Sequence, residues 1–203
     1  NSVGFHILKY ELAEDAYGNA SPPLAIRFYR VPSAPQVMTV QEALDTGDWL
    51  GQLATRETGL PVERSYYQIG SHAFMIRALP DDTRYANKDL RQVRINCVLG
   101  INEHINIIEG RPLEDADTAN ELLIWARPEF LSQVGLQIGE QFELFNYNAV
   151  HPDQPLRFRV AGVWEAKDPA GELWYKDPHE LLAEEFLTSI GAFGKFIAPF
   201  MPE

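Results

Sequence analysis

One stretch of this chain, residues 121–167, constrains the fold more than any other. It opens with the apolar run Leu-Leu-Ile-Trp at 122–125, which is typical of a buried strand. A segment at 128–134 carries apolar residues at the three-to-four spacing of an amphipathic helix, and alternating segments follow at 141–145 and 157–163. Alternation of this kind predicts strands that bury one face. We therefore expect a small unit of three strands and one helix.

Proline and glycine set the limits of the elements in this stretch. Pro128 suits the first turn of a helix, because the N–H that proline lacks would have no helical partner there. Gly135 is expected to end the helix, and Gly139 marks a turn before the next strand. Gly162 lies inside the last strand, where a glycine predicts a bulge or a close approach of another backbone.

The residues before this stretch predict two strands and a long helix. The strands are expected at 3–8 and 24–29, where apolar residues alternate with polar ones. Thr39 is a good N-cap, and Glu42 three residues later completes a capping box for a helix that starts at 40. Gly47 is a candidate break within that helix.

The remaining elements follow the same reasoning. The sequence Gly-Leu-Pro at 59–61 is expected to stop the helix, and Gly70-Ser71 is expected to turn a hairpin within the alternating region 62–79. Further elements are expected as a strand at 93–97, a strand at 185–189 and a final helix at 192–200. The sequence thus predicts an α+β fold, a mixed sheet with helices.

Composition excludes several classes of function. The chain has 203 residues, of which 45% are hydrophobic, so it can fill a core. Seventeen basic residues against 29 acidic ones give a net charge of -12, which argues against nucleic acid as a partner, since phosphate binding needs clustered Lys and Arg. The single cysteine, Cys97, excludes an intrachain disulfide, and its place in an apolar strand predicts a buried, inert thiol.

Several polar groups are candidate sites. Four carboxylates between 109 and 117 suggest a hard-cation site, but they lack the spacing and the glycine of a calcium loop, so a solvated acidic turn is favoured. His151 with Asp153, and His179 with Glu180, have the composition of a base and its orienting acid. No Ser or Cys lies in a nucleophile turn beside them. We expect no catalytic residue, no cofactor and no metal.

An aromatic pair, Trp174 and Tyr175, is the one candidate partner contact. It lies among Gly, Asp, Lys and Pro, in a segment that reads as a loop. Aromatic side chains exposed on a loop are a common means of binding a peptide, a lipoprotein or another subunit. Core packing accounts for most aromatic residues, so the pair is a candidate contact on the condition that it is exposed.

Two motifs carry a resemblance to a known family. The run Leu-Gln-Ile-Gly-Glu at 136–140 and the run Phe-Arg-Val-Ala-Gly-Val at 158–163, preceded by Asn-Ile-Ile-Glu-Gly-Arg-Pro-Leu at 106–113, resemble the extracytoplasmic core domain of MacB/FtsX-type ABC transporter permeases. The resemblance implies a membrane-proximal subdomain made of 1–117 and 168–203, with a β-rich subdomain inserted at 118–167.

The same resemblance implies a function without catalysis. Such a domain lies on the extracytoplasmic side of the cell membrane and moves when a separate ABC ATPase drives the transmembrane helices. It implies a second permease subunit as a dimer partner, and a lipoprotein, peptide or periplasmic adaptor as further partners. The chain has no apolar run long enough to span a bilayer and no signal peptide at its start, which taken alone favours a cytosolic protein. It begins at Asn-Ser-Val without an initiator Met, so we expect a piece of a longer protein, and the resemblance implies transmembrane helices on both sides of it.

Two alternatives stay open. A free-standing extracytoplasmic binding or adaptor protein would need a persistent pocket and native termini near this length. A hydrolase that uses the acidic cluster would show metal-dependent activity that is lost on Asp115→Asn.

Overall fold

The computed structural model describes residues 26–29, 39–85, 89–114, 121–145, 155–171, 173–174 and 178–200. Its elements run in the following order: α2 (Val40–Thr58), β1 (Gln68–Gly70), β2 (Phe74–Ala78), β3 (Asp89–Val98), η1 (Ile101–Glu103), β4 (Ile105–Gly110), β5 (Leu122–Ala126), α3 (Pro128–Val134), β6 (Gln141–Phe145), β7 (Leu156–Ala166), α4 (Pro178–Leu181), β8 (Glu185–Leu187), α5 (Ile190–Ala192), η2 (Phe193–Ile197) and η3 (Ala198–Phe200). One large mixed sheet with few helices confirms the predicted α+β class.

Six strands of this sheet form a closed ring. Antiparallel pairing joins β3 to β2, β2 to β6 and β6 to β7, while β5 lies parallel to β7. The short strand β8 completes the ring, because it pairs with β5 through Trp125 and Leu187 and runs parallel to β3. β1 and β4 extend the sheet beyond the ring, by pairing with β3 and β7. The sheet therefore has the closed pairing of a small barrel.

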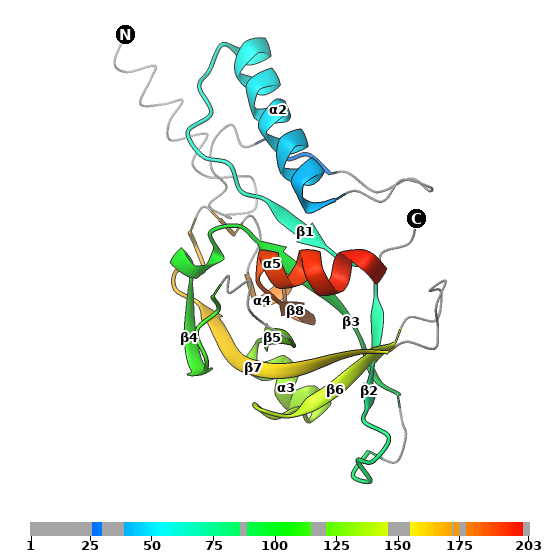
Figure 1. The fold of residues 1–203 in the computed structure, drawn as a ribbon. Helices are drawn as coiled ribbons and strands as arrows, with labels where there is room; N and C mark the ends of the chain where they lie inside the picture. The colour runs from blue at the N-terminus through cyan, green and yellow to red at the C-terminus, as the bar shows by residue number, and fades with distance from the viewer. Residues whose placement is uncertain are drawn as a thin grey trace.

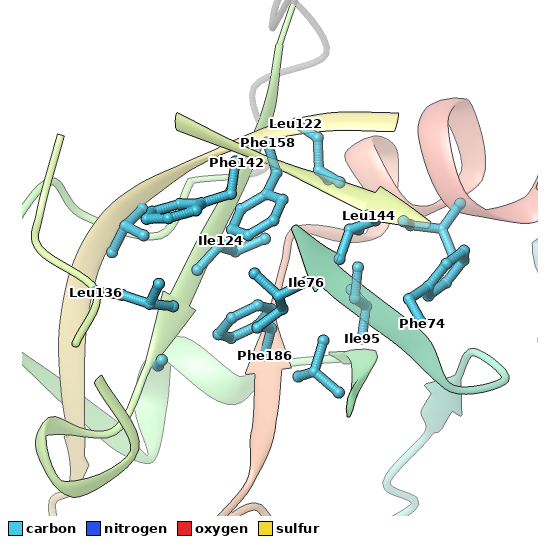
Figure 2. Packing of buried hydrophobic residues seen from close by; sticks show 14 of the residues in the cluster. Phe74, Ile76, Ile95, Leu122, Ile124, Leu136, Phe142, Leu144, Phe158 and Phe186 are labelled. Carbon is cyan, nitrogen blue, oxygen red and sulfur yellow. The ribbon is translucent and has the colours of Figure 1, made fainter. Parts of the chain in front are cut away.

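Apolar side chains fill the ring. Phe142 stacks on Phe158 with ring centroids 5.8 Å apart, and Phe158 lies 5.4 Å from Phe186. Figure 2 shows these rings among aliphatic side chains from the surrounding strands. The fully buried members are large: Phe74, Ile76, Ile95, Leu122, Ile124, Leu144 and the three phenylalanines. A small interior filled in this way leaves no room for a ligand within the described core.

A second apolar cluster covers one outer side of the ring. Trp125 and Leu187 alternate with inward-facing neighbours on β5 and β8, so they point to the opposite face of the sheet. They pack with residues of η1, β4, the segment after β4, β7 and the segment before β8, namely Ile101, Ile105, Leu113, Ala161, Trp164, Leu173, Trp174 and Leu182. The two clusters together bury both faces of β5 and β8.

The unit at 121–167 has the elements that the sequence predicts. The helix α3 starts at Pro128 and ends at Gly135, which has a positive φ of 81°. The close approach expected at Gly162 is confirmed, since a Cβ there would lie 2.8 Å from the carbonyl oxygen of Glu109 on β4. Arg157 and Arg159 lie on the outer face of β7, opposite buried Phe158 and Val160, as the alternation predicts.

The capping box of the long helix is also confirmed. The Thr39 hydroxyl accepts a hydrogen bond from the Glu42 N–H, and the Glu42 carboxylate accepts one from the Thr39 N–H. Gly59 ends the helix with a φ of 70°. The break considered at Gly47 is wrong: α2 is continuous, and the missing side chain makes room for the ring of Tyr67, whose Cε1 would lie 2.0 Å from a Cβ at this position.

The predicted hairpin at Gly70-Ser71 is wrong. β1 and β2 do not pair with each other; β1 pairs with residues 96–98 of β3, and β2 pairs with residues further back on the same strand, beginning at Val93. Ser71 joins the two, because its N–H donates to the Ile95 carbonyl and its hydroxyl accepts from the Ile95 N–H. β1 and β2 therefore pair with β3 one after the other, and Gly70 and Ser71 connect them without reversing the chain.

Two other expectations have mixed outcomes. The predicted strand at 3–8 lies outside the described residues, and residues 26–29 of the predicted strand 24–29 form no strand. The strand at 185–189 and the helical C-terminal segment are present as β8 and as α5, η2 and η3.

The division at 117/118 and 167/168 stays a prediction; strands β5, β6 and β7 share one sheet and one core with β2, β3 and β8.

Candidate functional site

The aromatic pair proposed as a partner contact is not an exposed pair. Trp174 is only 5% exposed and stacks on Trp164, with ring centroids 5.9 Å apart and ring planes 6° from parallel. The Arg127 guanidinium lies 5.7 Å from the centre of the Trp164 ring and donates to the Pro178 carbonyl. Because the residues around Trp174 are typical of a loop, the sequence did not reveal that Trp174 belongs to the second apolar cluster. Tyr175 lies outside the described residues.

The polar candidates do not come together as a site. Glu109 and Glu114 are exposed, whereas Asp115 and Asp117 lie outside the described residues. In the part of the chain that the structure describes, no three His, Cys, Asp or Glu side chains are placed to hold a metal. His151 and Asp153 are outside that part, and His179 and Glu180 belong to α4. Cys97 is buried on β3, as predicted.

A polar ladder crosses three strands at one side of the ring. The Gln68 amide donates to Asn96 Oδ1 over 3.1 Å, and Asn96 Nδ2 donates to a Glu185 carboxylate oxygen over 2.5 Å. Burial raises the pKa of Glu185, and Arg94 and the Asn96 bond only partly oppose that rise. These hydrogen bonds link β1, β3 and β8 at the point where β8 closes the ring.

His72 is a half-buried side chain near this region, with both ring nitrogens shielded from solvent. It follows Ser71 between β1 and β2, its ring lies 4.3 Å from that of Phe74, and neither ring nitrogen has a hydrogen-bond partner in the described structure. Burial lowers the pKa of His72, so the imidazole is neutral near neutral pH. No nucleophile or carboxylate is bonded to this neutral imidazole in the described structure. We therefore interpret His72 as a packing residue and not as a catalytic base.

The feature that sequence reasoning missed is a unit that stands apart from the ring. We call it the projecting arm and define it as α2 together with residues 59–67. No residue of α2 is buried, although its first residue, Val40, packs against the main core. Figure 1 shows α2 above the sheet, with the extended segment running back beside it to β1.

Three contacts fix the base of the projecting arm. The Tyr67 hydroxyl donates to Asp48 of α2, and the Tyr67 carbonyl accepts from the Leu99 N–H beside β3. The ring of Tyr66 meets that of His104 edge-on at 5.7 Å. An open groove lies between the two halves of the arm, with Gln52 and Thr55 on one side and Val62 on the other.

The projecting arm carries large apolar side chains in solvent. Trp49 is 58% exposed, Leu60 50%, Val62 44% and Tyr66 40%. A signal for Trp49 was present in the sequence, because helical spacing places it on the polar face of α2, beside Asp45 and Gln52. The exposed positions of Leu60 and Val62 carry no such signal, since an irregular segment has no period.

No helix among the described residues combines the length and the apolar character needed to cross a bilayer. A comparison with protein-family models finds no match, and a comparison with curated proteins also finds none.

Proposed function

We propose that this chain is the extracytoplasmic domain of a MacB/FtsX-type ABC transporter permease. In this role the domain couples ATP-driven motion of transmembrane helices to export, extraction or signalling outside the membrane. ATP hydrolysis belongs to a separate ATPase domain or subunit, and a second permease subunit is the dimer partner. The domain itself is not catalytic.

The order of elements at 121–167 carries this proposal. The motif Leu-Gln-Ile-Gly-Glu lies between α3 and β6, and the motif Phe-Arg-Val-Ala-Gly-Val lies in β7. Leu136 of the first motif is buried in the core, and Gly139 has a φ of 86° at the turn into β6. These positions give Leu136 a role in the core and Gly139 a role in the turn.

The architecture supports a mechanical role. A ring whose interior is filled by large, fully buried side chains deforms little, because protein interiors are packed as densely as organic crystals. A stiff ring joined to a projecting arm can pass a displacement from one end to the other as a rigid body. In the proposal, residues 1–117 and 168–203 form the membrane-proximal subdomain, and residues 118–167 form the inserted one.

Translation of the source gene on both sides of these codons tests the proposal. We expect an apolar stretch of about 20 residues directly before Asn1 and another directly after Glu203. A cleavable signal peptide before Asn1 together with a stop codon after Glu203 would contradict the permease assignment. That outcome would favour the free-standing binding or adaptor protein.

Nucleotide binding gives a second, independent check. Because the ATPase is a separate part of the transporter, the 203-residue chain should bind neither ATP nor ADP in equilibrium dialysis. Saturable ATP binding by this chain at micromolar concentration would contradict the assignment of the ATPase to a separate domain or subunit.

A further inference from the structure

Half of the large exposed apolar side chains of the described structure lie on the projecting arm: Trp49, Leu60, Val62 and Tyr66. Eight large hydrophobic residues are exposed, and seven of them lie between residues 26 and 66: Ile26, Phe28, Tyr29, Trp49, Leu60, Val62 and Tyr66. The eighth, Ile108, belongs to β4. Single exposed apolar residues are ordinary on a protein surface, but their concentration on one part of a molecule is typical of an interaction surface.

Trp49 is the dominant member of this set. The other three tryptophans, at 125, 164 and 174, are at most 5% exposed, whereas Trp49 is 58% exposed. It lies midway along α2, with Asp45 one turn before it on the same side of the helix, whereas Asp48, the preceding residue, accepts a hydrogen bond from Tyr67. Tryptophan is among the residues most often found to dominate the binding energy of an interface.

Charge indicates which partner fits this face. Helix α2 carries four carboxylates, on Glu42, Asp45, Asp48 and Glu57, against the single guanidinium of Arg56. Glu57 pairs with Arg56 and Asp48 accepts from Tyr67, so Asp45 is the carboxylate on the side of the indole. The excess of negative charge on α2 would repel a second copy of this chain and anionic lipid. A surface with lysine or arginine around an apolar pocket would be attracted and would also cover the indole.

We propose that the exposed face of α2 is a docking surface for a protein partner that presents a basic, apolar-centred contact region. Trp49 inserts into the apolar centre, and Asp45 faces the basic rim. Val62 and the open groove beside α2 extend the contact along the arm. This inference concerns the isolated chain in solution and does not depend on the permease assignment.

The first test asks whether Trp49 is free in the unbound chain. Since the other tryptophans are buried, collisional quenchers should reach only Trp49, and caesium should quench more than iodide because of the neighbouring carboxylates. Trp49→Phe should abolish the quenchable fraction. If the quenchable fraction is unchanged by Trp49→Phe, the chain itself covers this indole and the proposal is wrong.

The second test measures binding of a defined probe, a 14-residue amphipathic helical peptide of leucine and lysine, by fluorescence anisotropy at 150 mM salt. Trp49→Ala and Asp45→Lys should each weaken binding at least tenfold. Matched changes away from the projecting arm, Ile108→Ala on β4 and Asp81→Lys in the loop after β2, should alter it less than twofold. The corresponding leucine and glutamate peptide should not bind.

Each other outcome identifies another explanation. Equal losses from Asp45→Lys and Asp81→Lys would mean that the peptide responds only to net charge, which overturns the proposal. A concentration-dependent dimer that Trp49→Ala abolishes would assign the face to a second copy. Binding to phosphatidylglycerol vesicles that depends on Trp49 would assign it to lipid. Both results would contradict a basic protein partner.

Discussion

Tyr67 donates a hydrogen bond to a carboxylate oxygen of Asp48 over 2.6 Å, across 19 residues of sequence. This bond joins the two halves of the projecting arm, because Asp48 lies in α2 and Tyr67 lies just before β1. The hydrogen bond and partial burial raise the pKa of Tyr67. The bond fixes the direction in which α2 leaves the ring.

Tyr67→Phe should loosen the projecting arm without unfolding the ring. The lost hydrogen bond is worth about 0.5–1.5 kcal/mol, and the ring of the side chain stays in place over Gly47. Amide hydrogen exchange should accelerate in α2 and in residues 59–67 while β6 and β7 keep their protection. Tyr66→Phe is the matched control and should leave exchange unchanged; equal acceleration in both variants would rule out the bond as the cause.

Thr39→Ala should shift α2 toward the unfolded state. Because none of its residues is buried, this helix depends on its caps more than a packed helix does. Loss of the capping box should cost about 0.5–2 kcal/mol of local stability, seen as reduced helical ellipticity at 222 nm on warming. Thr55→Ala, within the same helix but away from the cap, should not reduce it.

Gly162→Ala should destabilise the pairing of β4 with β7. An added Cβ would lie 2.8 Å from the Glu109 carbonyl oxygen and 2.8 Å from the Trp125 ring, and neither can move freely. We expect a loss of about 1–3 kcal/mol in the free energy of unfolding by urea. Gly51→Ala is the control: nothing lies near its Cβ position, and the exchange should stabilise α2 by up to about 1 kcal/mol.

Phe186→Ala should open the ring at its weakest point. β8 is three residues long, and Phe186 is fully buried against Phe130 and Phe158, at 5.6 and 5.4 Å between ring centroids. Truncation should cost about 3–5 kcal/mol, measured by urea unfolding. If that variant does not fold, Phe186→Leu should fold with a loss of less than about 2 kcal/mol. A loss below 1 kcal/mol for the alanine variant would show that β8 does not hold the ring closed.

Stability should fall as the pH rises above about 4.5, through the titration of Glu185. Its pKa is raised in the folded state from the ordinary value of 4.5, so the folded chain holds this proton at a pH where the unfolded chain has lost it. The contribution is complete below the unfolded pKa and is lost as the pH passes the folded one.

Glu185→Gln should remove that dependence, because the amide oxygen can still accept from Asn96. Urea unfolding at pH 4.5 and pH 7 should show a gain for the variant that is larger at pH 7. Glu184→Gln, an exposed neighbour that pairs with Arg91, is the control and should change stability by less than about 1 kcal/mol at either pH.

Local signals in the sequence predicted the elements well. Pro128, Gly135 and the Thr39–Glu42 pair act within a few residues, so their roles as helix limits follow from the sequence alone. The alternation likewise predicted the buried residues at the start of β7, Phe158 and Val160, but not the continuous burial of residues 161–164, where the second apolar cluster covers the other face. Gly70-Ser71 misled because the contacts that keep this segment extended come from Ile95, 24 residues away.

The candidate site was not predictable in the same way. Trp174 lies among turn residues, and its burial depends on Trp164, which only the folded sheet brings beside it. Closure of the ring by β8 also depends on contacts of long sequence separation, with β3 and β5. Helical spacing signals the exposure of Trp49, but the exposure of Leu60 and Val62 depends on what does not pack against their irregular segment, and no local pattern encodes that.

The location of this domain in the full-length protein tests the central proposal most directly. Ile108→Cys places a thiol at an exposed position on β4, while the native Cys97 is only 1% exposed and gives little background. Intact source cells that express the full-length variant should be treated with a membrane-impermeant maleimide. The proposal predicts that Ile108→Cys is labelled in intact cells and that the unsubstituted protein is not. Labelling that occurs only after lysis would place the domain in the cytoplasm and contradict the permease assignment.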